Sequence, residues 1–178
     1  MQPVEISRAA LDRPSSHSLR RYLFWGAAAL VVALDQATKA IVRTLLERGE
    51  SWPPGDWPAH IRYVTNTGAA FGTLHNQTAF LIVMTFVGLA AIYLYYRYPP
   101  FDHPIVPAAI GMMLGGATGN LIDRVRLGEV TDFIDFPMWP QFNVADSSIT
   151  VGIAIILIGY VFLTRARPEP HEDRPADR

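Results

Sequence analysis

Apolar residues along this chain are gathered into four long blocks that polar segments separate. The blocks cover about residues 22–42, 79–96, 105–122 and 145–163. At a rise of 1.5 Å per residue, a helix over the first block is about 30 Å long, which matches the hydrocarbon thickness of a bilayer. We therefore predict four transmembrane helices, with both termini on the same side of the membrane.

The segment between the first two blocks has a different pattern. It contains Trp52, Gly55 and Trp57, followed at residues 60–64 by the β-prone run HIRYV. Such a run, bounded by proline and glycine, predicts short strands, which we place at the membrane surface. Residues 1–19 and 165–178 are polar, and we predict flexible tails there on either side of one four-span unit, residues 20–164.

Arginine is distributed unevenly over the two sides of this predicted topology. Nine arginines fall in the termini and the second loop, against five in the other two loops: Arg8, Arg13, Arg20, Arg21, Arg97, Arg165, Arg167, Arg174 and Arg178 against Arg43, Arg48, Arg62, Arg124 and Arg126. Because basic residues accumulate on the cytoplasmic side, this bias predicts cytoplasmic termini.

Composition removes several classes of chemistry. The net charge of −1 gives no basis for nucleic-acid binding. The absence of cysteine excludes disulfides, thiolate metal sites and a cysteine nucleophile. The five histidines are dispersed and show no HExxH spacing, so we expect no metal, no cofactor and an activity that chelators leave unchanged.

Ionisable residues in or beside the spans need a reason, because a charge in hydrocarbon costs several kcal/mol. Asp35 and Lys39 are four residues apart on the first predicted helix, which puts them on one face in the favourable order for an ion pair. The pair either holds helices together or positions a site. Asp123 stands beside Arg124, which would keep the carboxylate ionised, and we favour a structural role for it.

Two segments rich in small residues flank these charges. Residues 66–72 (NTGAAFG) combine small residues with the amide of Asn66, which is typical either of a turn or of a segment that binds a substrate. Residues 115–120 (GGATGN) permit close helix packing at the end of the third span, and Asn120 shares a helical face with the charged residues that follow.

Asp132 and Asp146 lie where the third span leaves and the fourth enters the membrane. Two carboxylates that share an apolar surround hold one proton between them, so one can activate water while the other polarises a carbonyl group. The simpler alternative is that Asp146 and Asn143 cap the fourth helix and Asp132 is a solvated loop acid. Spacing alone favours this alternative.

Four ordered blocks resemble the lipoprotein signal peptidase (signal peptidase II) family. They lie at residues 35–39 (DQATK), 66–71 (NTGAAF), 119–133 (GNLIDR and, further on, GEVTDF) and 142–147 (FNVADS). The resemblance covers about residues 22–159. Two departures are small: Thr131 stands where a valine is common, which we expect to be harmless, and the loop after Asp132 is short.

The resemblance implies a fold, a function and a site. The fold is an all-α membrane protein of four transmembrane helices with a small extracytoplasmic β platform and cytoplasmic termini. The function is that of an intramembrane aspartyl endopeptidase of the bacterial inner membrane, which cleaves diacylglyceryl-modified prolipoproteins before the lipidated cysteine. We expect a monomer in contact with membrane lipid. The implied catalytic pair is Asp132 and Asp146, and the implied supporting residues are Asp35, Lys39, Asn66, Gly68, Asn120, Asp123, Arg124 and Asn143.

Two other functions remain open at this stage. One is a Ser–Lys protease, with Ser147 or Ser148 as nucleophile and Lys39 as base, although Asp35 would keep that lysine protonated. The other is a non-enzymatic, proton-coupled membrane protein, which would need acids spread through the bilayer depth. The second span carries no acid at all.

Overall fold

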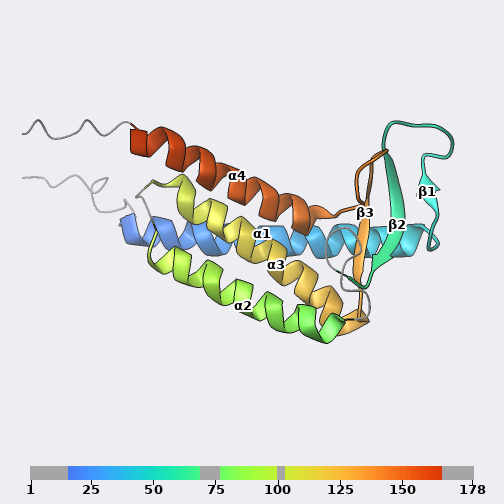
Figure 1. Ribbon diagram of the computed structural model, residues 1–178, viewed down its shortest axis with the longest axis horizontal. Helices are drawn as coiled ribbons and strands as arrows, with labels where there is room; N and C mark the ends of the chain where they lie inside the picture. The colour runs from blue at the N-terminus through green and yellow to red at the C-terminus, as the bar shows by residue number, and fades with distance from the viewer. Residues whose placement is uncertain (1–15, 69–76, 100–102, 166–178) are drawn as a thin grey trace, which may run out of the picture.

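Four helices and a small sheet make up the computed structural model, which describes residues 16–68, 77–99 and 103–165. The helices are α1 (Ser16–Leu45), α2 (Thr78–Arg97), α3 (Ile105–Leu127) and α4 (Val144–Arg165), and the strands are β1 (Ser51–Trp52), β2 (His60–Asn66) and β3 (Val130–Asp135). The helices alternate in direction along one long axis, and the sheet lies across one end of them (Figure 1). Each helix is long and apolar enough to cross a membrane, which confirms the four predicted spans.

The observed helix ends differ slightly from the predicted ones. Helix α1 already begins at Ser16, so residues 16–19 are helical, whereas residues 1–15 and 166–178 of the predicted tails lie outside the described residues. Helix α3 continues five residues past its predicted end, to Leu127. It stops at Gly128, whose φ of 78° and N–H bond to the Arg124 carbonyl form a left-handed cap that glycine adopts without strain. Asp123 and Arg124 therefore lie on α3.

Helix α3 is the centre of the bundle and packs against α1, α2 and α4. Its small residues allow this: a Cβ atom at Gly115 would collide with the carbonyl of Ala28 on α1, and one at Gly116 with the carbonyl of Ala145 on α4. Helix α2 lies at the periphery, and Leu81 is the buried residue among those of α2 that the structure describes. Tyr96 stacks on Phe24 of α1, whereas Val83, Phe86 and Val87 are exposed, as expected for a helix in contact with lipid.

The three strands form one antiparallel sheet in the order β1-β2-β3. Strand β2 confirms the prediction made for residues 60–64, and it pairs Val64 with Asp132 of β3. Two ion pairs reinforce the sheet: Arg62 of β2 pairs with Asp135 of β3, and Arg48, after α1, pairs with Glu129, just before β3. Strand β3, which carries Asp132, therefore lies across the helix ends.

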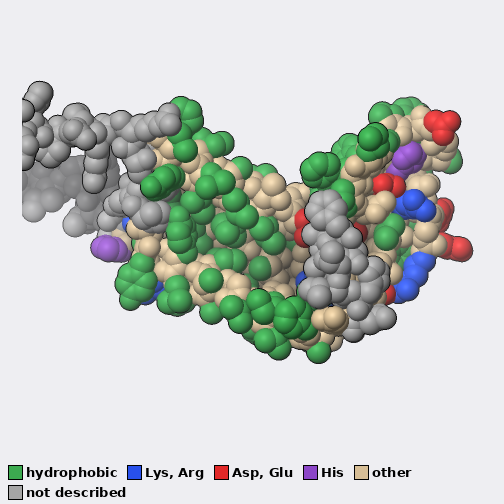
Figure 2. Space-filling model, in the orientation of Figure 1, with side chains coloured by type: hydrophobic (Ala, Val, Ile, Leu, Met, Phe, Trp, Pro, Cys, Tyr) green, Lys and Arg blue, Asp and Glu red, His purple; other side chains and the backbone are tan. Residues whose placement is uncertain are grey.

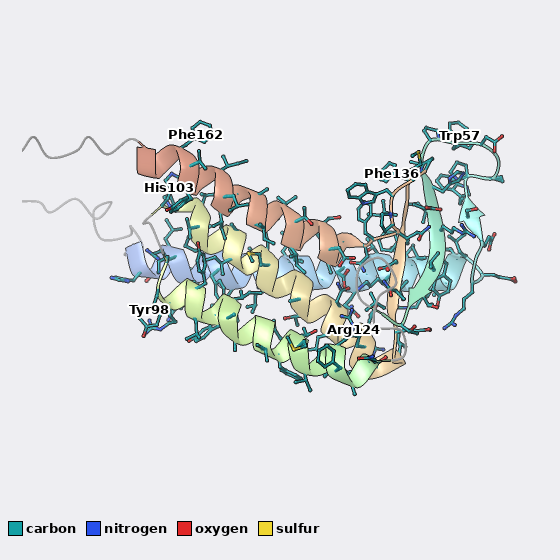
Figure 3. The ribbon with its side chains drawn as sticks, in the orientation of Figure 1. Trp57, Tyr98, His103, Arg124, Phe136 and Phe162 are labelled. Carbon is teal, nitrogen blue, oxygen red and sulfur yellow. The ribbon has the colours of Figure 1, made fainter. Side chains whose placement is uncertain are left out.

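Apolar and charged side chains occupy opposite parts of the molecule. Hydrophobic side chains cover the helical part, whereas charged ones gather at the sheet end (Figure 2). Arg124 and Phe136 lie toward that end, and Tyr98, His103 and Phe162 lie at the other (Figure 3). The beginning of α1 and the end of α4 are both far from the sheet.

Candidate active site

Asp132 is a buried acid on β3, with 3% of its surface exposed. Its Oδ1 accepts a hydrogen bond from Nδ2 of Asn143 at 2.7 Å, and its Oδ2 accepts one from Nδ2 of Asn66 at 3.1 Å. The alternative of a solvated loop acid is therefore wrong, because pairing with β2 holds the residue inside the molecule.

Asp146 lies in the first turn of α4. Its Oδ2 accepts the backbone N–H of Asn143 at 3.2 Å, and Oδ1 of Asn143 accepts the N–H of Asp146 at 3.1 Å. This reciprocal pair is a capping box, as the simpler alternative predicted. The other carboxylate oxygen, Oδ1, is not used by the cap and accepts a hydrogen bond from Nδ2 of Asn120 at 2.8 Å. Capping and a role in a site are thus compatible.

Both aspartates line one cavity of about 1050 Å³ between the helices and the sheet. Figure 2 shows the surface hollowed at this junction. Asn66, Gly68, Asn120 and Arg124 also line the cavity. The rest of its wall is mostly apolar and comes from β2, β3, the β3–α4 loop and α4: Val64, Val130, Phe136, Pro137, Trp139, Pro140, Phe142 and Val151. Such a cavity suits an apolar substrate that presents one polar bond to the acids.

Two asparagines connect the acids to each other. Asn143 is fully buried and bonds to Asp132 through its side chain and to Asp146 through its backbone. Its Nδ2 also lies 3.1 Å from Oδ1 of Asn120, which in turn accepts a hydrogen bond from Lys39 at 2.9 Å. The two carboxylates therefore have fixed orientations relative to one another.

A buried ionic cluster of Asp35, Lys39 and Asp123 lies next to this site and joins α1 to α3. Nζ of Lys39 lies 2.9 Å from Oδ2 of Asp35 and 3.2 Å from Oδ2 of Asp123, and all three side chains are at most 1% exposed. Asp35 also accepts the backbone N–H of Ala145 at 3.0 Å, which ties α1 to the start of α4. Its carboxylate fits here because Gly119 has no side chain: a Cβ atom there would collide with Oδ2.

The partner predicted for Asp123 is wrong. In the described part of the chain, Asp123 pairs with Lys39 and with Arg43 at 3.7 Å, and not with Arg124. Neighbouring residues on a helix project about 100° apart, so Arg124 points elsewhere. It lines the cavity and lies 3.5 Å from the carbonyl of Gly68. The cluster Asp35–Lys39–Asp123 lines no part of the cavity.

Burial changes the electrostatics of Asp132 strongly. Desolvation and then the negative charge of Asp146 raise the pKa of Asp132 to about 6, although hydrogen bonds from Asn66 and Asn143 and the charge of Lys39 oppose the rise. A carboxyl group with this pKa exchanges its proton in the weakly acidic range close to neutral pH, as acid–base catalysis requires.

Sequence reasoning missed three polar residues around this site. Nε2 of Gln36 lies within hydrogen-bond distance of Asp35, the carbonyl of Gly119 and Asp123. Arg43 donates to Oγ1 of Thr131 at 2.9 Å. The helical spacing of 35, 39 and 43 was a visible signal for Arg43, whereas nothing in the pattern pointed to Thr131.

The described geometry does not favour a Ser–Lys dyad. The hydroxyl groups of Ser147 and Ser148 donate to the carbonyls of Asn143 and Val144, one turn earlier on α4. Lys39 is held by two carboxylates and by Asn120, so its ammonium group is directed at these partners and not at either serine. Among the described residues, no group of three or more His, Asp and Glu side chains is arranged to hold a metal ion.

Four apolar spans, a small sheet and two buried acids on one cavity define a multi-pass membrane protein with a candidate site for acid–base chemistry. Comparisons with known proteins agree. The family "Signal peptidase (SPase) II" matches residues 27–162. The lipoprotein signal peptidase of Caldanaerobacter subterraneus subsp. tengcongensis is 48% identical over 137 residues, which are 76% of this chain and 92% of that protein. The lipoprotein signal peptidase of Moorella thermoacetica is 45% identical over 129 residues, 72% of this chain and 86% of that protein.

Solved structures show the same fold. A chain described as "Bacterial membrane enzyme structure by the in meso method at 2.3 A resolution" superposes with a TM-score of 0.74 and 35% identity, covering 81% of this chain and 90% of that one. A second bacterial membrane enzyme structure, at 1.9 Å resolution, superposes with a TM-score of 0.69 and 36% identity, covering 76% of this chain and 90% of that one. This chain belongs to the signal peptidase II family, and it is a membrane protease of that family.

Proposed function

We propose that Asp132 and Asp146 are the catalytic pair, and that the enzyme cleaves diacylglyceryl-modified bacterial prolipoproteins just before the lipidated cysteine. The observation that carries the proposal is that both carboxylates line one cavity while Asn143 bonds to both. The class of substrate follows the names of the relatives, which are lipoprotein signal peptidases.

The pair can hydrolyse a peptide bond without a covalent intermediate. With one proton shared, the ionised carboxylate takes a proton from a water molecule, whose oxygen attacks the scissile carbonyl carbon. The protonated carboxyl group gives its proton to the carbonyl oxygen, so a neutral diol forms. The diol then collapses: one of its hydroxyl groups gives its proton to the ionised carboxylate as the carbonyl re-forms, the bond to the cysteine nitrogen breaks, and the protonated carboxyl group gives its proton to that nitrogen. The pair is again singly protonated.

The other polar residues around the site have supporting roles in this proposal. Asn66, Asn120 and Asn143 orient the two carboxylates through hydrogen bonds. Asp35, Lys39 and Asp123 fix the helices beneath the pair. Gly68 and Arg124 lie on the cavity wall, where a guanidinium group can meet a carbonyl or ester oxygen of the substrate.

We further propose that the sheet faces the outside of the bacterial inner membrane and rests on the lipid surface. The excess of arginine at the other end supports cytoplasmic termini. Large apolar side chains are exposed at the sheet end, among them Trp52, Trp57, Met138 and Trp139. Tryptophan favours the interface between lipid and water, so these residues fit the headgroup region. The cavity between the sheet and the helices then lies near the outer face of the membrane. In this proposal the protein acts as a monomer.

A cleavage assay with a diacylglyceryl-modified prolipoprotein peptide tests the catalytic pair. We expect Asp132→Asn and Asp146→Asn each to lower kcat by roughly 10³-fold or more, because each removes one of two groups that act as a unit. Asp135→Asn is the matched control on the same strand: Asp135 accepts a hydrogen bond from Gln141 and lines no part of the cavity. Full activity of either Asn variant at normal expression would refute the pair.

A further inference from the structure

Arg43 extends from the last turn of α1 to the strand that carries Asp132. Its Nη1 donates to Oγ1 of Thr131 at 2.9 Å and lies 3.7 Å from Oδ1 of Asp123. The arginine side chain is 21% exposed, whereas Asp123 and Thr131 are each 1% exposed. The guanidinium group therefore ends inside the polar interior, although its stem begins at the edge of the bundle.

Thr131 is bonded to three different helices. Its hydroxyl accepts from Arg43 on α1, its N–H donates to Asp123 of α3 at 3.1 Å, and its carbonyl lies 3.3 Å from Nδ2 of Asn143 at the start of α4. The next residue is Asp132. The position of that carboxylate thus depends on how Thr131 is held, yet neither Thr131 nor Arg43 lines the cavity.

Arg43 also balances the charge of the buried cluster. Asp35 and Asp123 carry two negative charges, and Lys39 supplies one positive charge. Without Arg43 this cluster has a net charge of −1 in a region shielded from water, where uncompensated charge is costly. With Arg43 beside Asp123 the net charge is zero.

We propose that Arg43 is a positioning residue of the active site, which holds β3 through Thr131 so that Asp132 faces the cavity, and which neutralises the buried cluster beneath the catalytic pair. This proposal rests on the proposed function, since it assumes that Asp132 is catalytic.

Asp132 lies among charged and polar groups from every neighbouring element, and Arg43 adds one positive charge to them through its contact with Asp123. These are Asn66 on β2, Asn120, Asp123 and Arg124 on α3, Asn143 and Asp146 at the start of α4, and Asp35 and Lys39 on α1. Removing one positive charge from this set makes the surroundings of the pair more negative. The pair then holds its shared proton more tightly, and activity persists to higher pH.

Variants at the two positions separate the role of charge from that of the hydrogen bond. Arg43→Met removes both, and Arg43→Lys keeps the charge. Thr131→Val removes the hydrogen-bond acceptor at nearly constant volume, and Thr131→Ser keeps it. Arg126→Met is the control, because Arg126 is an exposed arginine in the last turn of α3. Each variant is assayed with the diacylglyceryl-modified peptide for kcat, KM and the pH profile, and its thermal midpoint is measured.

We expect Arg43→Met to lower kcat about tenfold with KM within about twofold, and to move the alkaline limb of the pH profile up by about half a pH unit or more. Arg43→Lys returns the limb to the wild-type position. Thr131→Val lowers kcat about five- to tenfold and leaves the alkaline limb of the pH profile in place, whereas Thr131→Ser keeps kcat at the wild-type value. Arg126→Met behaves as the wild type. In the double variant Arg43→Met with Thr131→Val, kcat falls by less than the product of the two single fold-decreases, because the two residues share one hydrogen bond.

An unchanged kcat and pH profile per folded molecule in Arg43→Met, with only a lower thermal midpoint, would overturn the positioning role. Independent, multiplicative effects of Arg43→Met and Thr131→Val would overturn it as well. Activity in Asp132→Asn or Asp146→Asn would instead refute the catalytic pair itself, so the two failures are distinguishable.

Discussion

Asp132 shows how a single buried carboxylate links stability to pH. Its pKa is about 6 in the folded protein, against an ordinary value of 3.8. The folded state therefore binds the proton more tightly than the unfolded state does. The free energy of unfolding falls as the pH rises from about 4 to about 6, by roughly 3 kcal/mol for this group at most.

We expect Asp132→Asn to remove most of this pH dependence. The thermal midpoint of the wild type should fall between pH 4 and pH 7 by more than that of the variant, and the variant should be the more stable of the two at pH 7. Melting curves in the same detergent, followed by tryptophan fluorescence, measure the difference. Parallel curves for the two proteins would show that the pKa of Asp132 is not raised.

The same carboxyl group sets a limit on activity at high pH. In the proposed mechanism Asp132 and Asp146 act with one proton between them, and that proton leaves as the pH rises through the pKa of Asp132. We expect kcat/KM of the free enzyme to fall above about pH 6 and the corresponding limb of kcat to lie at higher pH, because a bound apolar substrate excludes water. A profile that rises steadily from pH 5 to pH 8 would contradict this assignment.

At the scale of elements, Gly119 on α3 makes room for the carboxylate of Asp35 on α1. A side chain at Gly119 would collide with Asp35, whose carboxylate is already held by Lys39 and by the N–H of Ala145. We expect Gly119→Ala to lower the stability by about 1–3 kcal/mol and to lower cleavage as well. Gly88→Ala on α2 is the matched control, since nothing lies within 4 Å of its Cβ position. Thermal midpoints of the two variants test the contrast, and equal midpoints would contradict it.

The helices could be predicted from the sequence, but one strand could not. Long apolar blocks predict spans directly, and the run at 60–64 predicts β2. Strand β3 has no such signal, because Val130, Thr131, Asp132 and Phe133 are all buried and no alternation of apolar and polar residues remains. The strand exists through its pairing with β2, which is a tertiary effect.

The site was predictable in part for similar reasons. The stripe of Asp35, Lys39 and Arg43 follows helical spacing, so the sequence could show that these residues share a face. It could not show that Asp123 turns toward Lys39 and away from Arg124, because that depends on how α3 is rotated against α1. Nor could it show that Thr131, a departure expected to be harmless, is the hydrogen-bond partner of Arg43.

At the scale of the whole molecule, the arrangement predicts which surface meets the outside of the cell. The chain has no cysteine, so one introduced thiol is the only one present. Asp56 lies beside the sheet, between β1 and β2, and Tyr98 lies at the opposite end of the bundle. We expect a membrane-impermeant maleimide to label Asp56→Cys in intact spheroplasts and to label Tyr98→Cys only after lysis. The reverse result would invert the proposed topology.

Lys39 gives the protein a built-in probe of its own opening. It is the only lysine in the chain, and its side chain is fully buried between α1 and α3. An amine-reactive reagent can therefore modify a lysine side chain only in molecules whose helices have separated. The rate of that modification, read by mass spectrometry of the peptide around Lys39, measures how often the bundle opens in the membrane, without any engineered label.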